Sequence, residues 1–281
     1  MKFFGTKNIK LFVERILTSR EAEFKDKIVI DIPAGSGFST EILQRIGAKV
    51  EAYDLFPEFF KVNGLTCKEA DLSKEIPVAD NYADYVLSQE GIEHLPDQLH
   101  MFKEVNRILK KGGVCLLTTP NYSMLRSRLS YFLAESEYAY KLMPPNELDS
   151  IWFSDQQRPE LYFGHIFLVG IQKLRVLARL AGFRIKKIHH LRINRTSLLF
   201  LPFFYPFIFI INFCSYKRAM SKNPDIDPEK KRAVYWEIFK LGIDPRILVG
   251  GHLFVEFEKE NHLSEANGIL RSRYANFDVI T

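Results

Sequence analysis

The chain of 281 residues is 47% apolar, 14% aromatic and 26% charged, an ordinary globular composition that excludes a disordered, collagen-like or disulfide-scaffold protein. Its 39 lysines and arginines against 34 acidic residues leave a net charge of +5, too small an excess to predict a nucleic-acid partner. Three cysteines without a C-x-x-C pair, and an N-terminus without a cleavable apolar core, predict a reduced cytoplasmic protein with no secretory signal.

Strands alternate with helices along most of the chain. An amphipathic helix over 7–19 precedes an apolar strand over 27–31, a glycine turn and a helix over 39–46. The later expected strands are 49–53, 65–69, 82–88, 114–118, 183–190 and 253–257, and the later helices are 56–61, 97–109 and 171–181. Because these strands are mostly continuous apolar runs, the pattern predicts a parallel sheet covered on both faces, which is a doubly wound α/β fold.

Two segments interrupt this alternation. Residues 121–165 leave the sheet after the fifth strand and are rich in aromatic side chains, which predicts a lid over the carboxyl edge of the sheet or, alternatively, an extra helical pair. Residues 191–248, apolar and basic, lie between the sixth and seventh strands. We therefore predict a single domain over 1–258 with these two insertions, followed by a polar tail over 259–281.

The turn after the first strand and the ends of the next two strands carry candidate ligand-binding residues. Gly35 and Gly37 allow a ligand to approach the backbone closely, but Thr40 stands where a dinucleotide motif has its third glycine, which argues against a nicotinamide cofactor. Asp54 ends the second strand, where a carboxylate can accept both hydroxyls of a ribose. Asp31 and Asp71 are also strand-end residues, and Asp71 is placed to accept from an adenine amino group. The alternative is that all three aspartates are caps, but their recurrence at successive strands beside a glycine turn favours a nucleoside site.

At these residues the sequence resembles the class I S-adenosylmethionine-dependent methyltransferases. Their first motif, D-x-G-x-G-x-G after a strand, corresponds here to Asp31-Ile32-Pro33-Ala34-Gly35-Ser36-Gly37, with proline at a position where the family usually has glycine. The likeness continues through Ala70-Asp71-Leu72, Asp84-Tyr85-Val86-Leu87-Ser88, Glu93-His94-Leu95, Leu109-Lys110-Lys111-Gly112-Gly113 and Thr118-Thr119-Pro120-Asn121.

This resemblance implies a Rossmann-like, seven-stranded, mostly parallel sheet and S-adenosyl-L-methionine as the cofactor. Gly35 and Gly37 would face its methionine and ribose, and Asp54 the ribose hydroxyls. Leu72 would meet the adenine together with Asp71. The full set of implied cofactor-binding residues is Asp31, Ala34, Gly35, Gly37, Asp54, Leu55, Asp71, Leu72, Ser88 and Gln89, with the last two beside the transferable methyl.

Methyl transfer from a sulfonium is an in-line displacement in which alignment alone contributes roughly 7–11 kcal/mol, so a general base is optional. If the acceptor is a hydroxyl, the candidate bases are His94 and His165, with Glu90 and Tyr122 behind them. The alternatives are that His94 orients the following helix and that His165 is a buried, hydrogen-bonded histidine. The spacing of the seven histidines predicts no metal site.

The segment 197–214 contains no charge in eighteen residues, close to the ~20 residues that span a bilayer. Since the strands on either side belong to one sheet, the chain must leave and return on the same side, and basic residues at both ends mark both as cytoplasmic. Pro202 and Pro206 are expected to break a straight helix. We therefore predict an interfacial or re-entrant element at the inner face of the membrane, the alternative being a helix pair buried against the lid or in a homodimer.

Together these features predict a methyltransferase that acts on oxygen of a lipid-linked or amphiphilic acceptor, such as a polyprenyl-linked sugar, a glycolipid or a quinone. One alternative is a soluble methyltransferase for a small hydroxylated metabolite, with the apolar insertion as a dimer contact. Others are a scaffold that binds the cofactor without turnover and, more distantly, a nicotinamide oxidoreductase.

Overall fold

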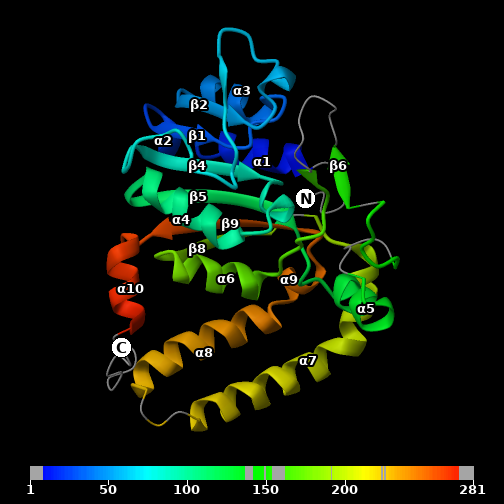
Figure 1. Ribbon diagram of the computed structural model, residues 1–281. Helices are drawn as coiled ribbons and strands as arrows, with labels where there is room; N and C mark the ends of the chain where they lie inside the picture. Colours follow the sequence, from blue (N-terminus) through cyan, green and yellow to red (C-terminus); the bar gives the residue numbers. More distant parts are fainter. Residues whose placement is uncertain are drawn as a thin grey trace.

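The computed structural model describes residues 9–136, 142–148, 150–153, 162–190, 192–222, 224 and 226–271. Its main sheet has seven strands in the order β3-β2-β1-β4-β5-β9-β8 (Figure 1). The strands are β1 (Ile28–Asp31), β2 (Lys49–Asp54), β3 (Cys67–Glu69), β4 (Ala83–Gln89), β5 (Leu109–Pro120), β8 (Phe183–His189) and β9 (His252–Lys259). All neighbouring strands are parallel except that β9 runs antiparallel to both β5 and β8. The predicted doubly wound α/β fold is confirmed.

Helices cover both faces of this sheet because its central strands are buried on both sides. Val29 of β1 packs toward α1 (Ile9–Thr18), α2 (Glu21–Phe24) and α3 (Phe38–Arg45). Its neighbour Ile30 points to the opposite face, toward the core beneath α4 (Gln98–Ile108) and α6 (Ile171–Leu180). Helix α10 (Leu263–Arg271) packs against α4 and α6, so these residues form a docked helix within the segment expected to be a polar tail.

Short elements differ more from their predicted lengths. The helix expected over 56–61 is a 3-10 turn, η1 (Pro57–Phe59), and a second 3-10 turn, η2 (Ile92–His94), follows β4. The described part of the lid consists of α5 (Leu125–Ala134) and a small hairpin of β6 (Ile151–Phe153) and β7 (Tyr162–Phe163). Residues 137–141, 149 and 154–161 of the predicted lid lie outside the described residues.

The insertion between β8 and β9 forms α7 (Arg195–Ser221), α8 (Pro228–Ile243) and the short α9 (Pro245–Val249). The predicted break at Pro202 and Pro206 is wrong, because both prolines lie inside one continuous helix. The two prolines are four residues apart, so they lie on the same side of α7. The backbone hydrogen bonds that they cannot donate are therefore missing on that side alone, and α8 packs along the length of α7.

Helix α8 lies between α6 and α7, which leaves α7 as the outermost layer of the molecule (Figure 1). On the sheet side, Arg175 of α6 donates to Glu237 of α8 at 2.8 Å. On the other side, aromatic rings of both helices interlock, with centroids 5.1–6.2 Å apart; they are Phe209, Phe213, Tyr216, Trp236 and Phe239.

Candidate functional site

A cavity of about 600 Å³ lies at the carboxyl ends of β1, β2 and β4. This is the edge of an open α/β sheet where ligands bind. The predicted cofactor residues that line the cavity are Ala34, Gly35, Asp54, Leu55, Asp71, Leu72 and Gln89, and His94 lines it as well. Those that lie outside its lining are Asp31, Gly37 and Ser88.

The two glycines of the turn have different surroundings. Gly35 has φ +54°, and a Cβ built on it would meet no atom within 4 Å, so its backbone borders open space in the cavity. Gly37 has φ +84° and caps α3, and a Cβ there would lie 2.3 Å from Val62 and 2.6 Å from Phe60. Gly37 therefore allows the chain after η1 to pack against the turn, and it lies outside the lining of the cavity that the family resemblance implied it would face.

Asp54 ties the glycine turn to the end of β2. Its Oδ2 accepts from the backbone N–H of Gly35 at 2.7 Å, and its Oδ1 accepts from the N–H of Phe56 at 2.8 Å. The side chain is nearly buried yet borders the cavity. A carboxylate oxygen has two lone pairs, so each oxygen retains capacity to accept from a bound hydroxyl.

Asp31 lies beneath the turn rather than in the cavity. It is fully buried, and its Oδ2 accepts from the hydroxyl of Thr40 at 2.6 Å. Burial, with a smaller contribution from the charge of Asp54, raises the pKa of Asp31 to about 7. Its bond to Thr40 ties the end of β1 to α3, the two elements that the glycine turn joins.

The remaining predicted residues differ in how they meet the cavity. Asp71 lines it, but its Oδ1 accepts from the N–H and hydroxyl of Ser73 at 2.8 and 2.7 Å, which forms a turn after β3. Gln89 lines the cavity and donates to the hydroxyl of Ser39. Ser88 is buried one residue earlier, on the other side of the strand.

The candidate bases gather at one end of the cavity. The rings of His94 and His165 lie with centroids 4.8 Å apart, and His94 Nδ1 lies 2.7 Å from the carbonyl oxygen of Phe163. Glu90 lines the cavity and accepts from Thr118 at 3.0 Å. Tyr122, the fourth candidate, packs instead at the base of the lid.

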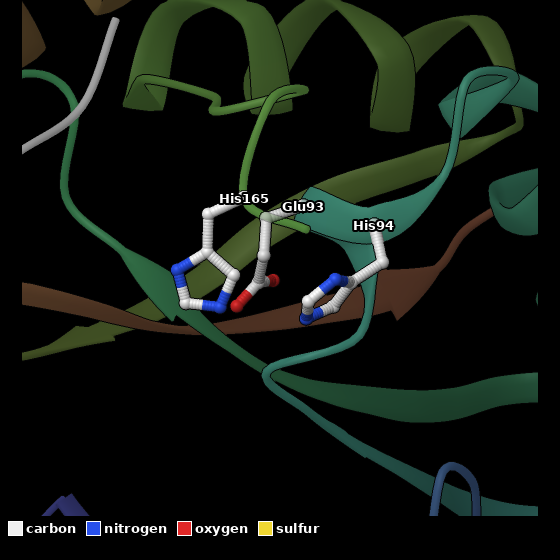
Figure 2. Close-up of side chains that lie close together, drawn as sticks. All are labelled: Glu93, His94 and His165. Carbon is white, nitrogen blue, oxygen red and sulfur yellow. The ribbon is translucent and has the colours of Figure 1, made fainter. Parts of the chain in front are cut away.

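Glu93 joins the two histidines, and sequence analysis did not select it. One ligand atom from each of Glu93, His94 and His165 lies within 4.8 Å of the others, and Figure 2 shows the three side chains converging. We call these residues the Glu93–His94–His165 cluster. Its donor set, one carboxylate and two imidazoles, is one that divalent metals bind. Histidine spacing could not reveal it, because His165 comes from the far end of the lid.

Other cavity residues were also missed. Helix α1 contributes Ile9 and Lys10, and the segment after β2 contributes Phe56 and Phe59. The amphipathic pattern of 7–19 predicted that this helix covers something, but not what.

A family model described as a methyltransferase domain matches residues 5–188, well over half of the chain. Among solved structures, a SAM-dependent methyltransferase from Archaeoglobus fulgidus shares the fold, with a TM-score of 0.50 and 18% identity over 89% of this chain and 94% of that one.

Curated relatives include ubiquinone biosynthesis O-methyltransferases. The protein of that name from Xanthomonas campestris pv. campestris is 34% identical over 130 residues, which cover 41% of this chain and 52% of the relative. That of Thiobacillus denitrificans is 33% identical over 134 residues, 44% of this chain and 56% of the relative. This chain thus spans about half the length of the curated relatives it matches.

Proposed function

Because this chain belongs to the methyltransferase domain family, it is an S-adenosylmethionine-dependent methyltransferase, and we propose that it methylates a hydroxyl oxygen of a quinone-like or otherwise amphiphilic acceptor at a membrane surface. The observation that carries the acceptor class is the exposed apolar helix α7, on the same chain as a methyl-donor cavity. The names of the curated relatives favour oxygen as the atom methylated and a quinone-like ring as the acceptor.

The cavity fits the methyl donor in size and chemistry. A volume of about 600 Å³ suits a nucleoside with an amino-acid tail. In our proposal Gly35 lies against the donor because any Cβ there would enter the cavity, and Asp54 accepts the ribose hydroxyls. Leu55 and Leu72 contact the adenine, while Ala34 and Gln89 lie along the methionine part.

Three predicted cofactor residues take supporting roles in this proposal. Asp31 and Gly37 hold the turn from beneath and from the α3 side, and Ser88 lies behind Gln89. Asp71 shapes the adenine end through its bonds to Ser73, so we expect the neighbouring Leu72 to supply more of the contact there.

S-adenosylmethionine supplies an electrophilic methyl group on a positively charged sulfur. The chain's own task is to align an acceptor oxygen with that carbon and to take up the hydroxyl proton. His94 borders the cavity, and the Phe163 carbonyl next to its Nδ1 fixes the orientation of its ring. We assign His94 the contact with the acceptor hydroxyl and His165 the position directly behind it.

Helix α7 supports a membrane-associated acceptor. It is long and apolar enough to cross a bilayer, and only 6% of its most apolar window is buried. Phe203 is 69% exposed and Phe207 65% exposed. Basic residues stand at both ends of the helix, where they can meet anionic headgroups; they are Arg192, Arg195, Lys217, Arg218 and Lys222.

The packing of α7 favours a position in the membrane surface over a full crossing. Helix α8 runs along α7 and carries exposed Lys230, Arg232 and Lys240, which a crossing would carry into the hydrocarbon region. An interfacial helix keeps those charges in water while its apolar side enters the headgroup boundary.

Vesicle flotation tests this proposal. We expect the wild type to float with vesicles containing anionic lipid and the double variant Phe203→Ser/Phe207→Ser to lose at least about tenfold in binding. The matched control is Val176→Ser/Leu180→Ser, which removes two exposed apolar side chains at the same spacing on α6 and should bind like the wild type. Equal binding by both double variants would contradict a membrane role for α7.

Transfer of labelled methyl groups identifies the acceptor class. With labelled S-adenosylmethionine and a lipid extract, we expect label in the organic phase. Label only in the aqueous phase, from a chain that sediments as a dimer without detergent, would support the soluble alternative in which α7 pairs with a second copy. Cofactor binding without any S-adenosylhomocysteine would support a non-catalytic scaffold.

A further inference from the structure

We propose that the Glu93–His94–His165 cluster binds one divalent transition-metal ion at the edge of the methyl-donor cavity. The three ligand atoms already lie within 4.8 Å of one another (Figure 2). Ligands of a tetrahedral site at the usual metal distances are about 3–4 Å apart, so small side-chain movements close the site.

The buried carboxylate of Glu93 is the strongest sign of a missing cation. Glu93 is completely buried, and its Oε2 accepts from the hydroxyl of Thr119 at 3.0 Å. Its Oε1 is buried and has no hydrogen-bond partner among the described residues. A buried acceptor without a partner costs folding free energy, and a cation beside it removes that cost.

Electrostatics agree with this geometry. Burial and the nearby charge of Glu90 raise the pKa of Glu93 well above its ordinary value, because nothing in this buried position compensates a negative charge. A bound cation would supply that compensation.

The two histidines are prepared to act as ligands. The Phe163 carbonyl can only accept a hydrogen bond, so His94 Nδ1 carries the proton and Nε2 becomes the ligating nitrogen. The ring of His165 lies with its centroid 4.8 Å from that of His94, and one of its nitrogens is among the three ligand atoms of the cluster.

The donor set selects the class of metal. Two imidazoles and one carboxylate suit Zn²⁺, Mn²⁺ or Fe²⁺ better than Mg²⁺ or Ca²⁺, which prefer oxygen ligands. Three protein ligands also leave at least one position open, as in catalytic rather than structural sites. Since His94 also lines the cavity, an oxygen bound at that position would lie next to the methyl donor.

The role of the metal in methyl transfer rests on the proposed function. With a metal bound, His94 would be a ligand and no longer the proton acceptor; an acceptor hydroxyl on the metal would have a lowered pKa and release its proton to solvent instead. The oxygen then forms a bond to the methyl carbon as the carbon–sulfur bond breaks, and that electron pair remains on sulfur and cancels its positive charge. The transfer needs no oxidant or reductant.

Titration with Co²⁺ tests binding without reference to activity. Protein freed of metal by a chelator, and carrying no histidine tag, should bind one Co²⁺ per chain with a visible absorption band that Zn²⁺ abolishes. We expect Glu93→Gln and His165→Ala each to weaken Co²⁺ binding by at least about 100-fold. The matched control is His190→Ala, which removes an exposed histidine of the sheet edge and should bind like the wild type.

Thermal melts and calorimetric binding of S-adenosylmethionine show whether each variant is folded. His165 is exposed, so His165→Ala decides the question even if Glu93→Gln fails to fold. The proposal is overturned if the wild type gives no Co²⁺ band, or if the band survives in folded His165→Ala protein. If the chain binds Co²⁺ through this cluster but transfers no methyl group, the metal-site proposal stands and the proposed function is refuted.

Discussion

Replacing Asp54 tests the cofactor cavity most directly. In the proposed complex its carboxylate accepts two ribose hydroxyls, and hydrogen bonds to a charged group contribute about 1.5–3 kcal/mol each. Losing both in Asp54→Ala would cost about 3–6 kcal/mol of binding free energy, a weakening of about 10²–10⁴-fold. The N–H groups of Gly35 and Phe56 also lose their acceptors, which loosens the turn further.

The conservative substitution Asp54→Asn is also expected to weaken binding. The two carboxylate oxygens accept from two different N–H groups, at 2.7 and 2.8 Å. An amide has one oxygen and one NH₂ group, so it can serve only one of them and places a donor against the other. We expect a loss of at least about tenfold in this variant.

Isothermal titration with S-adenosylmethionine and S-adenosylhomocysteine measures these losses. The matched control is Asp84→Asn, because Asp84 also accepts a backbone N–H, from Ile28 at 2.9 Å, but lies away from the cavity. A dissociation constant for folded Asp54→Ala within about threefold of the wild type would refute the assignment of this cavity to the cofactor.

Three further outcomes are expected. Gly35→Val should abolish cofactor binding in calorimetry, because a side chain at φ +54° is strained and would fill the cavity; unchanged binding would contradict close approach there. The pKa of Asp31, raised to about 7 by burial, means that the folded protein keeps a proton which the unfolded chain releases near pH 4. The free energy of unfolding should therefore fall as the pH rises from about 4 to 7, and Asp31→Asn should flatten that slope in urea titrations. Lys259→Met should destabilise the fold by roughly 3 kcal/mol or more in urea unfolding, because the buried ammonium donates to Asn81 and to the carbonyls of Asn106 and Leu109 at 2.6–3.0 Å; a loss under about 1 kcal/mol would contradict this.

Local sequence pattern was enough to predict several residues of the cavity. Gly35, Asp54 and Leu72 each lie at or just after the end of a parallel strand, and the carboxyl ends of such strands meet at a single edge of the sheet. Their proximity therefore follows from the strand order that the alternation of elements implies.

Residues whose roles depend on distant packing were beyond such reasoning. Gly37 resembles a ligand-facing glycine, but Phe60 and Val62 occupy the space beside it. Glu93 and His165 meet only because the lid returns to η2, which no periodicity encodes. Pro202 and Pro206 were expected to break a straight helix, and the packing of α8 along α7 outweighs this local preference.

The outer helices join the sheet through a narrow base. Ile193 pairs with Gly250 in an isolated bridge, Asn194 N–H donates to the Val249 carbonyl at 2.7 Å, and Gly251 N–H donates to the Arg192 carbonyl at 2.9 Å. The chain thus leaves β8 and re-enters β9 at adjacent points, so the two ends of the α7–α9 insertion are fixed to one another at the sheet. A change in the length of the insertion between these ends therefore need not alter the register of β8 and β9.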